Sequence, residues 1–145
     1  MRYLMMFKAS DEYEAGEMPG EDSIEKMTTV MAEMAERGVL LAGDGLAPSS
    51  QGFRLQSQGG KPRVIDGPFA ETKELVAGFA LIQVASREEA EEWARRCFEA
   101  DSGNSSGLEL RRIFDADDFG DEFTPQARER SETFREVAEG NLKKD

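Results

Sequence analysis

The chain has 145 residues, 30 acidic and 18 basic, with a formal net charge of −12, no histidine and one cysteine. This length fits one domain with its own hydrophobic core, and the missing histidine excludes Ser-His and Cys-His nucleophile pairs. A single cysteine forms neither an internal disulfide nor a thiolate zinc site, and the acidic excess opposes nucleic-acid binding.

No stretch approaches the ~20 consecutive apolar residues that a membrane-spanning helix needs, and no cleavage site follows the apolar residues 3–7. We therefore expect a cytoplasmic protein with no membrane or nucleic-acid partner. The acids exceed the bases mainly in residues 1–38 and 114–145, which is typical of solvated ends.

The chain begins with a predicted strand and helix. Residues 2–8 are apolar on both faces in their middle, which is typical of a buried central strand. Asp22 followed by Glu25 has the form of a capping box, and apolar residues then recur at helical spacing. This pattern predicts an amphipathic helix over residues 22–38.

A glycine-containing segment follows the next strand. Residues 39–42 predict a short apolar strand that runs directly into Gly43, Asp44 and Gly45. Two glycines this close permit a tight turn or the close approach of a ligand. No helical pattern follows, so the segment is not a dinucleotide-binding fingerprint.

Three further elements are strands. Residues 52–56 and 62–65 flank a pair of glycines and predict a β-hairpin. Residues 78–84 predict a buried strand, and residues 108–114 predict the last strand of the domain.

The clearest helix signal lies between these last two strands. Ser86 and Glu89 form a second capping box, and Ala90, Trp93 and Cys97 recur on one helical face. We expect Cys97 to be a buried, inert thiol, because it lies in the apolar stripe.

The composition changes after the last strand. Residues 115–145 are rich in acids, and Thr124 followed by Pro125 is typical of a helix start. We therefore divide the chain into a domain of residues 1–114 and an acidic, partly helical C-terminal extension of residues 115–145.

Without the hairpin, the predicted order is strand, helix, strand, strand, helix, strand. This order is the split βαβ arrangement of the ferredoxin-like α+β fold, here with an inserted β-hairpin. Helices cover one face of such a sheet, and the apolar pattern of the strands predicts a second layer on the other face. A second copy of the chain is the simplest such layer.

The stretch from Asp66 to Glu74 is the least ordinary in the sequence. In residues 66–69, named the DGPF loop below, Asp66 can hydrogen-bond to turn amides, Gly67 allows a positive φ and Pro68 fixes the next φ. Phe69 can anchor the loop. These residues describe a well-formed turn or a ligand site on a loop, and both interpretations stay open.

This stretch, DGPFAETKE, resembles the YCII-related proteins that bear a DGPF motif, as do the GDGL segment and the LELRRIF strand. The resemblance runs from Arg2 to about Phe119, and the tail that begins DADDFGDEFTP is similar to that of a longer bacterial subgroup. It implies a dimeric α/β barrel with a cleft near the loop and no assigned reaction. Some relatives are suspected enzymes with a His-Asp pair, and some are associated with extracytoplasmic-function sigma factors.

This chain cannot form the His-Asp pair of those relatives, because it has no histidine. Ala47 occupies a position where relatives often have histidine. Asp66 is the remaining candidate for a catalytic acid or base, and the alternative is a carboxylate that caps its own turn. Lys73 can hold an anion or pair with a neighbouring carboxylate, and Arg111 or Arg112 can reach the cleft.

The candidate ligand-binding residues are therefore Gly43, Asp44, Gly45, Asp66, Gly67, Pro68, Phe69, Glu71, Lys73, Glu74 and Arg111. Four of these are acids that could hold a hard cation, but no known loop spacing supports this, so we expect no metal and no cofactor. The sequence predicts a homodimer that binds a small molecule in an intersubunit cleft lined by the DGPF loop. The alternatives are an enzyme that uses Asp66, and a regulatory module that binds another protein.

Overall fold

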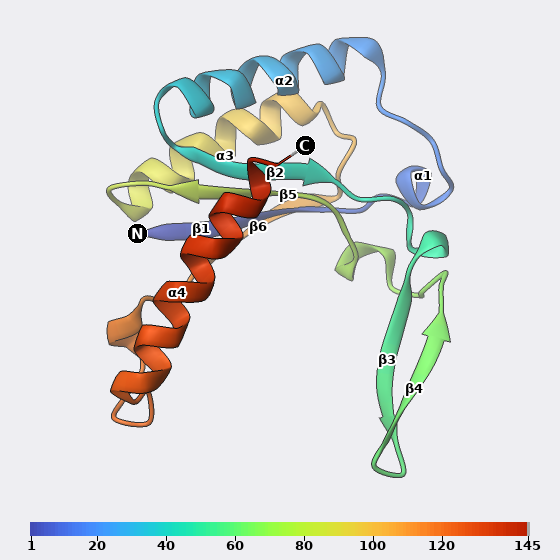
Figure 1. The fold of residues 1–145 in the computed structure, drawn as a ribbon. Coiled ribbons are helices and arrows are strands. Elements are labelled where there is room, and N and C mark those ends of the chain that lie inside the picture. Colours follow the sequence, from blue (N-terminus) through green and yellow to red (C-terminus); the bar gives the residue numbers. More distant parts are fainter. Residues whose placement is uncertain (145) are drawn as a thin grey trace. The chain divides into compact units, whose positions relative to one another are not determined.

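The computed structural model describes residues 1–144, and it divides into two compact units, Met1–Ile113 and Phe114–Asp145. The strands of the first unit (Figure 1) are β1 (Arg2–Lys8), β2 (Leu40–Gly45), β3 (Phe53–Gln58), β4 (Lys61–Asp66), β5 (Val76–Gln83) and β6 (Gly107–Arg112). Its helices are α1 (Asp11–Glu14), α2 (Glu21–Glu36) and α3 (Arg87–Asp101), with short 3-10 turns η1 (Ser49–Gln51) and η2 (Thr72–Glu74).

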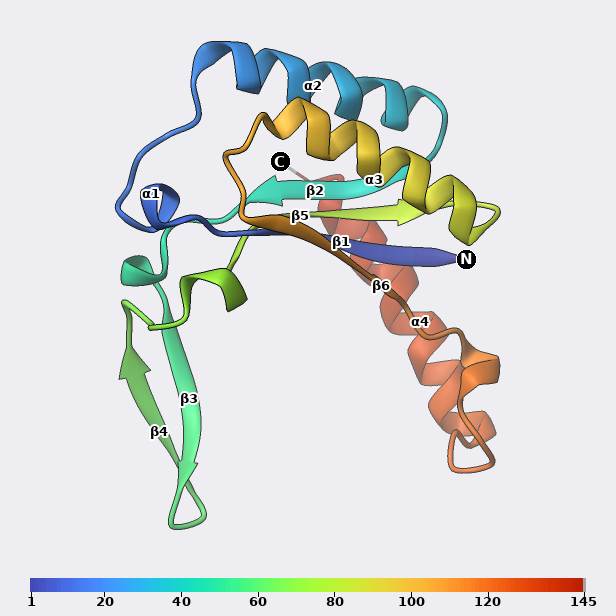
Figure 2. The same ribbon diagram turned by 180° about the vertical axis from the view of Figure 1, so that it is seen from behind.

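Four strands form one antiparallel sheet in the order β2-β5-β1-β6. Helices α2 and α3 lie together on one face of this sheet, as Figure 1 and the reverse view in Figure 2 show. Strand β1 is central, which agrees with its apolar residues on both faces. The α+β class predicted from the sequence is confirmed.

The core lies between the sheet and the two helices. Met5 of β1 and Ala80 and Ile82 of β5 are 0% exposed, as are Met34 of α2 and Cys97 of α3. Met5 lies opposite Ala80 in the sheet, so these side chains share the face that the helices cover. Burial of this apolar surface is the main stabilising contribution to the fold.

The opposite face of the sheet is also apolar at its centre. The register pairs Leu4 with Leu81 and Met6 with Phe79, on the alternate positions of β1 and β5. Leu4 also lies opposite Arg111 of β6, so Arg111 belongs to this second face. The four apolar residues are called the second sheet face below.

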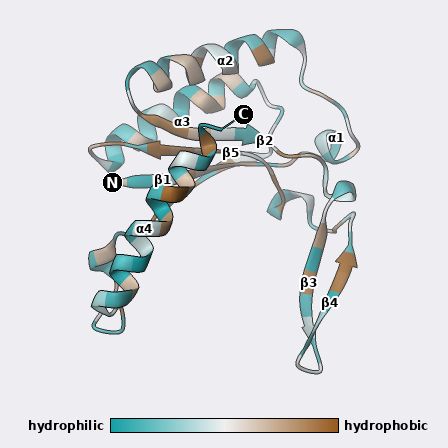
Figure 3. Ribbon diagram, in the orientation of Figure 1, coloured by the Kyte–Doolittle hydropathy of each residue, from teal (hydrophilic) through white to brown (hydrophobic). Residues whose placement is uncertain are grey.

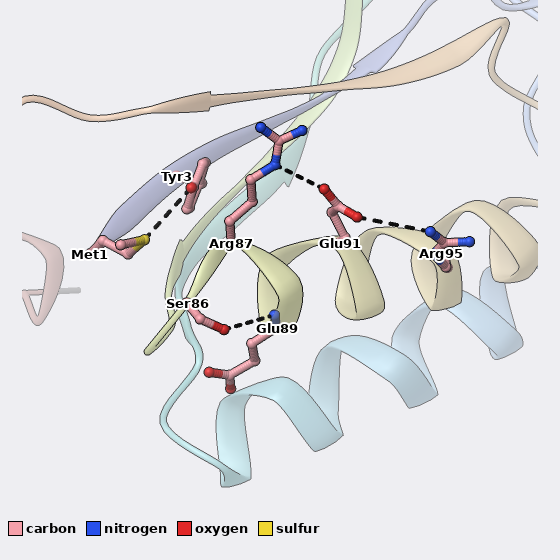
Figure 4. Close-up of polar contacts among 7 residues, drawn as sticks. All are labelled: Met1, Tyr3, Ser86, Arg87, Glu89, Glu91 and Arg95. Carbon is pink, nitrogen blue, oxygen red and sulfur yellow. Dashed lines mark hydrogen bonds and ion pairs between the residues drawn. The ribbon is translucent and has the colours of Figure 1, made fainter.

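Helix α3 begins where the sequence predicts. Ser86 accepts a hydrogen bond from the Glu89 amide at 3.1 Å, and the Glu89 carboxylate accepts one from the Ala85 amide at 2.8 Å. Within the first turn of α3, the Arg87 side chain donates a hydrogen bond to the Glu91 carboxylate, four residues later, at 2.9 Å (Figure 4). The predicted cap by Ser86 is therefore confirmed, but the reciprocal bond of a capping box is not formed, because the Glu89 carboxylate accepts from the Ala85 amide and not from the Ser86 amide.

The capping box predicted for α2 is wrong. The helix begins one residue earlier than expected, after Gly20, and no side chain caps it. Asp22 therefore lies inside the first turn, where its carboxylate forms an ion pair with Lys26 at 2.7 Å. The backbone position of Asp22, and not its residue type, excludes it from the capping role.

Strands β3 and β4 form a separate two-stranded sheet, the predicted hairpin. Phe53 pairs with Asp66 and Gln58 pairs with Lys61 at the turn. Gly59 and Gly60 form that turn with φ of 58° and 79°, a conformation that favours glycine.

The second unit contains a 3-10 turn, η3 (Ala116–Asp118), and a helix, α4 (Pro125–Leu142). Thr124 caps α4 by accepting a hydrogen bond from the Ala127 amide at 3.2 Å, as its sequence predicts. Before the helix, the ring of Phe119 lies 5.3 Å from that of Phe114 and 5.0 Å from that of Phe123. Across residues 1–144, no helix has the length and hydropathy of a membrane span.

Candidate functional site

A cavity of about 360 Å³ lies between α2 and the end of the sheet where β2 and β5 meet. Its walls are mainly apolar. Met27 and Met31 of α2, Phe7 of β1, Leu40 of β2 and Met18 of the loop before α2 contribute to it. The cavity therefore lies within the first unit, beside the core.

The Gly43-Asp44-Gly45 segment lines this cavity as part of β2. It does not form the tight turn that glycines at this spacing permit, because it pairs with β5, Asp44 opposite Phe79 and Gly45 opposite Gly78. A Cβ atom on Gly43 would lie 3.1 Å from the Phe79 carbonyl oxygen. The glycines thus allow close packing of two strands at the cavity wall.

Tyr13 of α1 connects the cavity to both neighbouring strands. Its hydroxyl lies within hydrogen-bond distance of two carbonyl oxygens, that of Leu46 after β2 and that of Ala77 in β5, the latter at 2.9 Å. Partial burial raises the pKa of the Tyr13 phenol above its usual range, and the Glu14 carboxylate acts in the same direction. The phenol therefore stays a neutral hydrogen-bond donor at physiological pH.

Two acidic residues contribute to the lining, and they differ in their partners. Asp101 accepts a hydrogen bond from the Ser105 amide at 2.6 Å, so it is used within the loop after α3. Asp44 is exposed, and its carboxylate has no hydrogen-bond or ion-pair partner within residues 1–144, but Asp44 lies opposite Phe79 and so shares the second sheet face. The Asp44 side chain is therefore directed away from the sheet face that α2 covers and not into this cavity.

The DGPF loop lies elsewhere, against η1, and none of its residues contributes to this cavity. The Gly67 amide donates to the Gly52 carbonyl at 3.0 Å, and the Phe69 amide donates to the Ser49 hydroxyl at 3.0 Å. A Cβ atom on Gly67 would lie 1.8 Å from the Ser49 carbonyl oxygen, so only glycine fits. The Arg54 guanidinium lies 3.9 Å from the centre of the Phe69 ring.

Glu14 positions Ser49 for its contact with the Phe69 amide. Its carboxylate accepts hydrogen bonds from the Ser49 amide, at 3.0 Å, and from the Ser49 hydroxyl. The same hydroxyl oxygen accepts from the Phe69 amide. Neither Glu14 nor Ser49 was predicted from the sequence, because they are 35 residues apart and lie in segments with no periodic signal.

The other predicted residues of this stretch do not converge on one point. Asp66 is exposed at the end of β4, and within the described residues its carboxylate has no hydrogen-bond or ion-pair partner. Glu71 has a left-handed backbone, with φ of 61°, and its carbonyl accepts from the Glu74 amide at 2.8 Å. Lys73 and Pro68 are exposed, and the peptide bond before Pro68 is cis.

Arg111 lies on β6, at the edge of the second sheet face, and is exposed. The eleven predicted ligand residues are thus spread over four places: the β2 segment at the cavity, the DGPF loop against η1, the turn η2 and the second sheet face. In the part of the chain that the structure describes, no three Cys, Asp or Glu side chains are placed to hold a metal ion.

Cys97 is buried in the core, as predicted, and is 0% exposed. Its sulfur lies 3.8 Å from the sulfur of Met34. Burial raises the pKa of the Cys97 thiol to about 11, and the nearby Arg96 opposes this only in part. Cys97 is therefore a neutral packing group and not a nucleophile.

Comparison with known proteins gives a family for this chain. A model of the YCII-related domain matches residues 1–116. An uncharacterized protein of Rhizobium meliloti (strain 1021) is 38% identical over 80 residues, which cover 55% of this chain and 64% of that protein.

A solved structure is similar at lower identity. It is 5-chloro-2-hydroxyhydroquinone dehydrochlorinase (TftG) from Burkholderia phenoliruptrix AC1100, in complex with 2,5-dihydroxybenzoquinone. The match covers 83% of this chain and 100% of that chain, with 12% identity and a TM-score of 0.43. At this level of similarity, the binding properties of the chain have to be argued from its own residues.

Proposed function

The chain belongs to the YCII-related domain family, and we propose that it binds a small, largely apolar molecule in the cavity between α2 and the sheet. The observation that carries this proposal is the cavity itself. Its volume of about 360 Å³ is in the lower part of the range of roughly 300–1,000 Å³ that is typical of small-molecule sites. Its lining combines apolar walls with a few polar groups, which is also typical of such sites.

The apolar walls favour a ligand with an aromatic or branched aliphatic body. Met18, Met27 and Met31 all contribute to them. Methionine is unbranched and polarizable, so its side chain adapts to the shape of a bound molecule and contacts aromatic rings favourably. Three methionines give the cavity an adaptable wall opposite the rigid strands β2 and β5.

The polar groups favour a ligand that donates hydrogen bonds. The Asp101 carboxylate, which also lines the cavity, only accepts hydrogen bonds when ionised. The Tyr13 hydroxyl already lies against two carbonyl oxygens. A hydroxyl, amide or amine group on an apolar body therefore matches this cavity better than a carboxylate does.

The second sheet face supports the predicted homodimer. Its apolar centre is formed by Leu4, Met6, Phe79 and Leu81, and an apolar sheet face needs a cover. Arg111 on β6 and Asp44 on β2 lie on opposite edge strands and carry opposite charges. In a two-fold arrangement such a face is self-complementary, because each edge can meet the other.

We therefore retain the proposal of a ferredoxin-like subunit that forms a dimeric α/β barrel. The strand order β2-β5-β1-β6, with α2 and α3 on one face, supports the ferredoxin-like part. A cleft lined by the DGPF loop and a role of Asp66 as acid or base stay predictions that depend on the second copy. Asp66 has no partner in the described part of its own subunit that would position it for proton transfer.

The cavity proposal is tested with 8-anilinonaphthalene-1-sulfonate, an anionic dye with an apolar aromatic body whose fluorescence increases in apolar sites. We expect the dye to bind the wild type, and Met31→Trp to weaken binding at least tenfold by filling the cavity. Ala32→Trp is the matched control, because it adds the same side chain at the exposed neighbouring position of α2. Its affinity should stay within about twofold of the wild type.

Two outcomes would contradict the cavity proposal. Equal dye affinity in the wild type and both variants would place the dye on another surface, and the absence of dye binding in the wild type would leave the cavity without a ligand. Displacement then tests the ligand class. Apolar amines and alcohols should displace the dye at lower concentrations than carboxylates of the same size.

A further inference from the structure

The hairpin of β3 and β4 is a second feature of the first unit that needs a partner. Every residue of β3 is exposed, as is every residue of β4 except Ile65. The two strands form a sheet of their own, and a two-stranded sheet in water is only marginally stable by itself. The hairpin therefore gains stability from any surface that packs against it.

One face of the hairpin is apolar. Phe53, Leu55 and Val64 are 66%, 63% and 57% exposed. Leu55 lies opposite Val64, and Phe53 lies two residues before Leu55, so all three side chains share one face. Figure 3 shows hydrophobic residues in both strands. A contiguous exposed apolar patch of this kind marks an interaction surface.

The opposite face of the hairpin is polar and basic. Arg54 and Gln56 alternate with the apolar residues of β3, and Arg63 lies opposite Gln56. With Lys61 at the turn, the hairpin has three basic residues and one acid, Asp66, whereas the whole chain has a net charge of −12. The hairpin and the remainder of the chain therefore carry opposite net charge.

The DGPF loop fixes the base of this hairpin. Gly67 follows β4 directly, and Gly52 directly precedes β3. The Gly67 amide donates a hydrogen bond to the Gly52 carbonyl oxygen at 3.0 Å. The Phe69 ring packs under the Arg54 guanidinium of β3 at 3.9 Å, and the Phe69 amide is held by Ser49. The loop thus contacts η1 and both ends of the hairpin base, so it sets the direction in which the hairpin projects.

We propose that the hairpin is an arm that packs its apolar face on a second copy of this chain, and that the DGPF loop is the anchor of this arm. The inference rests on the homodimer proposed above. Figure 1 and Figure 2 show that the hairpin extends away from α2 and α3, toward the side of the second sheet face. A second copy that covers this face lies beside the arm.

Charge also favours a second copy as the partner. The basic residues of the arm lie on the face opposite its apolar patch, and each copy of the chain is strongly acidic outside the arm, so charge attracts the arm to a second copy at long range. Complementary charges of this kind guide association, while the apolar contacts supply the burial. Under two-fold symmetry the contact is formed twice, once by each arm.

The proposal is tested by sedimentation equilibrium with two neighbouring residues of β3. We expect the wild type to be a dimer at micromolar concentration, and Leu55→Glu to raise the dimer dissociation constant at least tenfold. Gln56→Glu is the matched control, because it adds the same carboxylate to the opposite face of the same strand. It should change the dissociation constant by less than about threefold.

A photo-crosslinking amino acid at the same two positions gives an independent test. A benzophenone side chain at position 55 should give a covalent product of twice the chain mass, and one at position 56 should give much less of it. Far-ultraviolet circular dichroism checks that each variant is folded.

The outcomes separate this inference from the dimer itself. A wild type that is monomeric at micromolar concentration overturns both proposals. A wild-type dimer whose dissociation constant is unchanged in Leu55→Glu, with no crosslinked dimer from position 55, overturns the arm alone and leaves the second sheet face as the interface. Equal weakening by Leu55→Glu and Gln56→Glu also overturns the arm, because a change in charge then explains the effect without the apolar face.

Discussion

The Gly43-Asp44-Gly45 segment and the DGPF loop are both short glycine-containing stretches with an aspartate, yet the structure uses them differently. In the first, glycines let β2 approach β5, and the segment becomes part of a cavity wall. In the second, Gly67 packs directly on the Ser49 carbonyl, and the loop holds the base of the hairpin. A glycine-rich motif on a loop is therefore not by itself evidence of a ligand site.

Alanine at one glycine of each segment, Gly67 or Gly43, gives the largest expected difference between them. Gly67→Ala would place a Cβ atom 1.8 Å from the Ser49 carbonyl oxygen, so the loop has to leave η1. Loss of its two backbone hydrogen bonds and the Arg54 contact should cost about 3 kcal/mol of unfolding free energy. Urea unfolding, followed by the fluorescence of Trp93 at fixed protein concentration, measures this.

Gly43→Ala is the matched substitution in the other segment. The new Cβ atom lies 3.1 Å from the Phe79 carbonyl oxygen, which a small shift of the strand relieves. The lower backbone entropy of alanine in the unfolded chain partly offsets the strain, so we expect stability within about 1 kcal/mol of the wild type. Equal effects of the two substitutions would contradict the contrast between a loop anchor and a cavity wall.

Two neighbouring residues of α1 contact different segments. Glu14 binds Ser49, which holds the DGPF loop, whereas Tyr13 lines the cavity. Glu14→Gln weakens the acceptor for the Ser49 amide and hydroxyl and should cost about 1.5 kcal/mol. Amide exchange should become roughly tenfold faster at Ser49 and Phe69, with little change at Leu46. Hydrogen exchange followed by NMR measures all three amides in one experiment.

Glu12→Gln is the control for this prediction, because it makes the same change two residues earlier at an exposed position of α1. It should leave the Ser49 and Phe69 amides at their wild-type exchange rates. Faster exchange at Leu46 in Glu14→Gln would show that the loop and the cavity open together, and the comparison between them would then fail.

The parts of the fold that were predicted from the sequence depend on local signals. Ser86 and the spacing of Ala90, Trp93 and Cys97 place α3 without any knowledge of the remainder of the chain. Gly59 and Gly60 place the hairpin turn in the same way, since their positive φ is a local property. The α+β class follows from the order of such elements.

The parts that could not be predicted depend on contacts between distant segments. The Gly43-Asp44-Gly45 segment is part of a strand only because β5 is there to pair with it. Glu14 reaches Ser49 across 35 residues, from a helix of four residues that has no periodic pattern. The DGPF motif itself is visible in the sequence, but its contact with Ser49 is not.

Tyr13 provides the smallest effect, and the size of this effect depends on pH. Tyr13→Phe removes a hydroxyl that lies against the Leu46 and Ala77 carbonyls and should cost about 1 kcal/mol near pH 8. Burial raises the pKa of Tyr13 in the folded state, so above pH ~10 the unfolded chain loses this proton first. The advantage of the wild type over Tyr13→Phe is therefore fully present below pH ~10 and decreases as the pH rises further.

Urea unfolding of both proteins between pH 8 and pH 11 measures this decrease. Tyr3→Phe, which removes the other tyrosine, is the control, because a similar loss in both variants would point to general alkaline unfolding. Dye binding at pH 8 completes the comparison: Tyr13→Phe should alter dye affinity at the cavity, whereas Glu14→Gln should not. The opposite result would mean that α1 holds the cavity through Ser49 and the DGPF loop, and not through the Tyr13 hydroxyl.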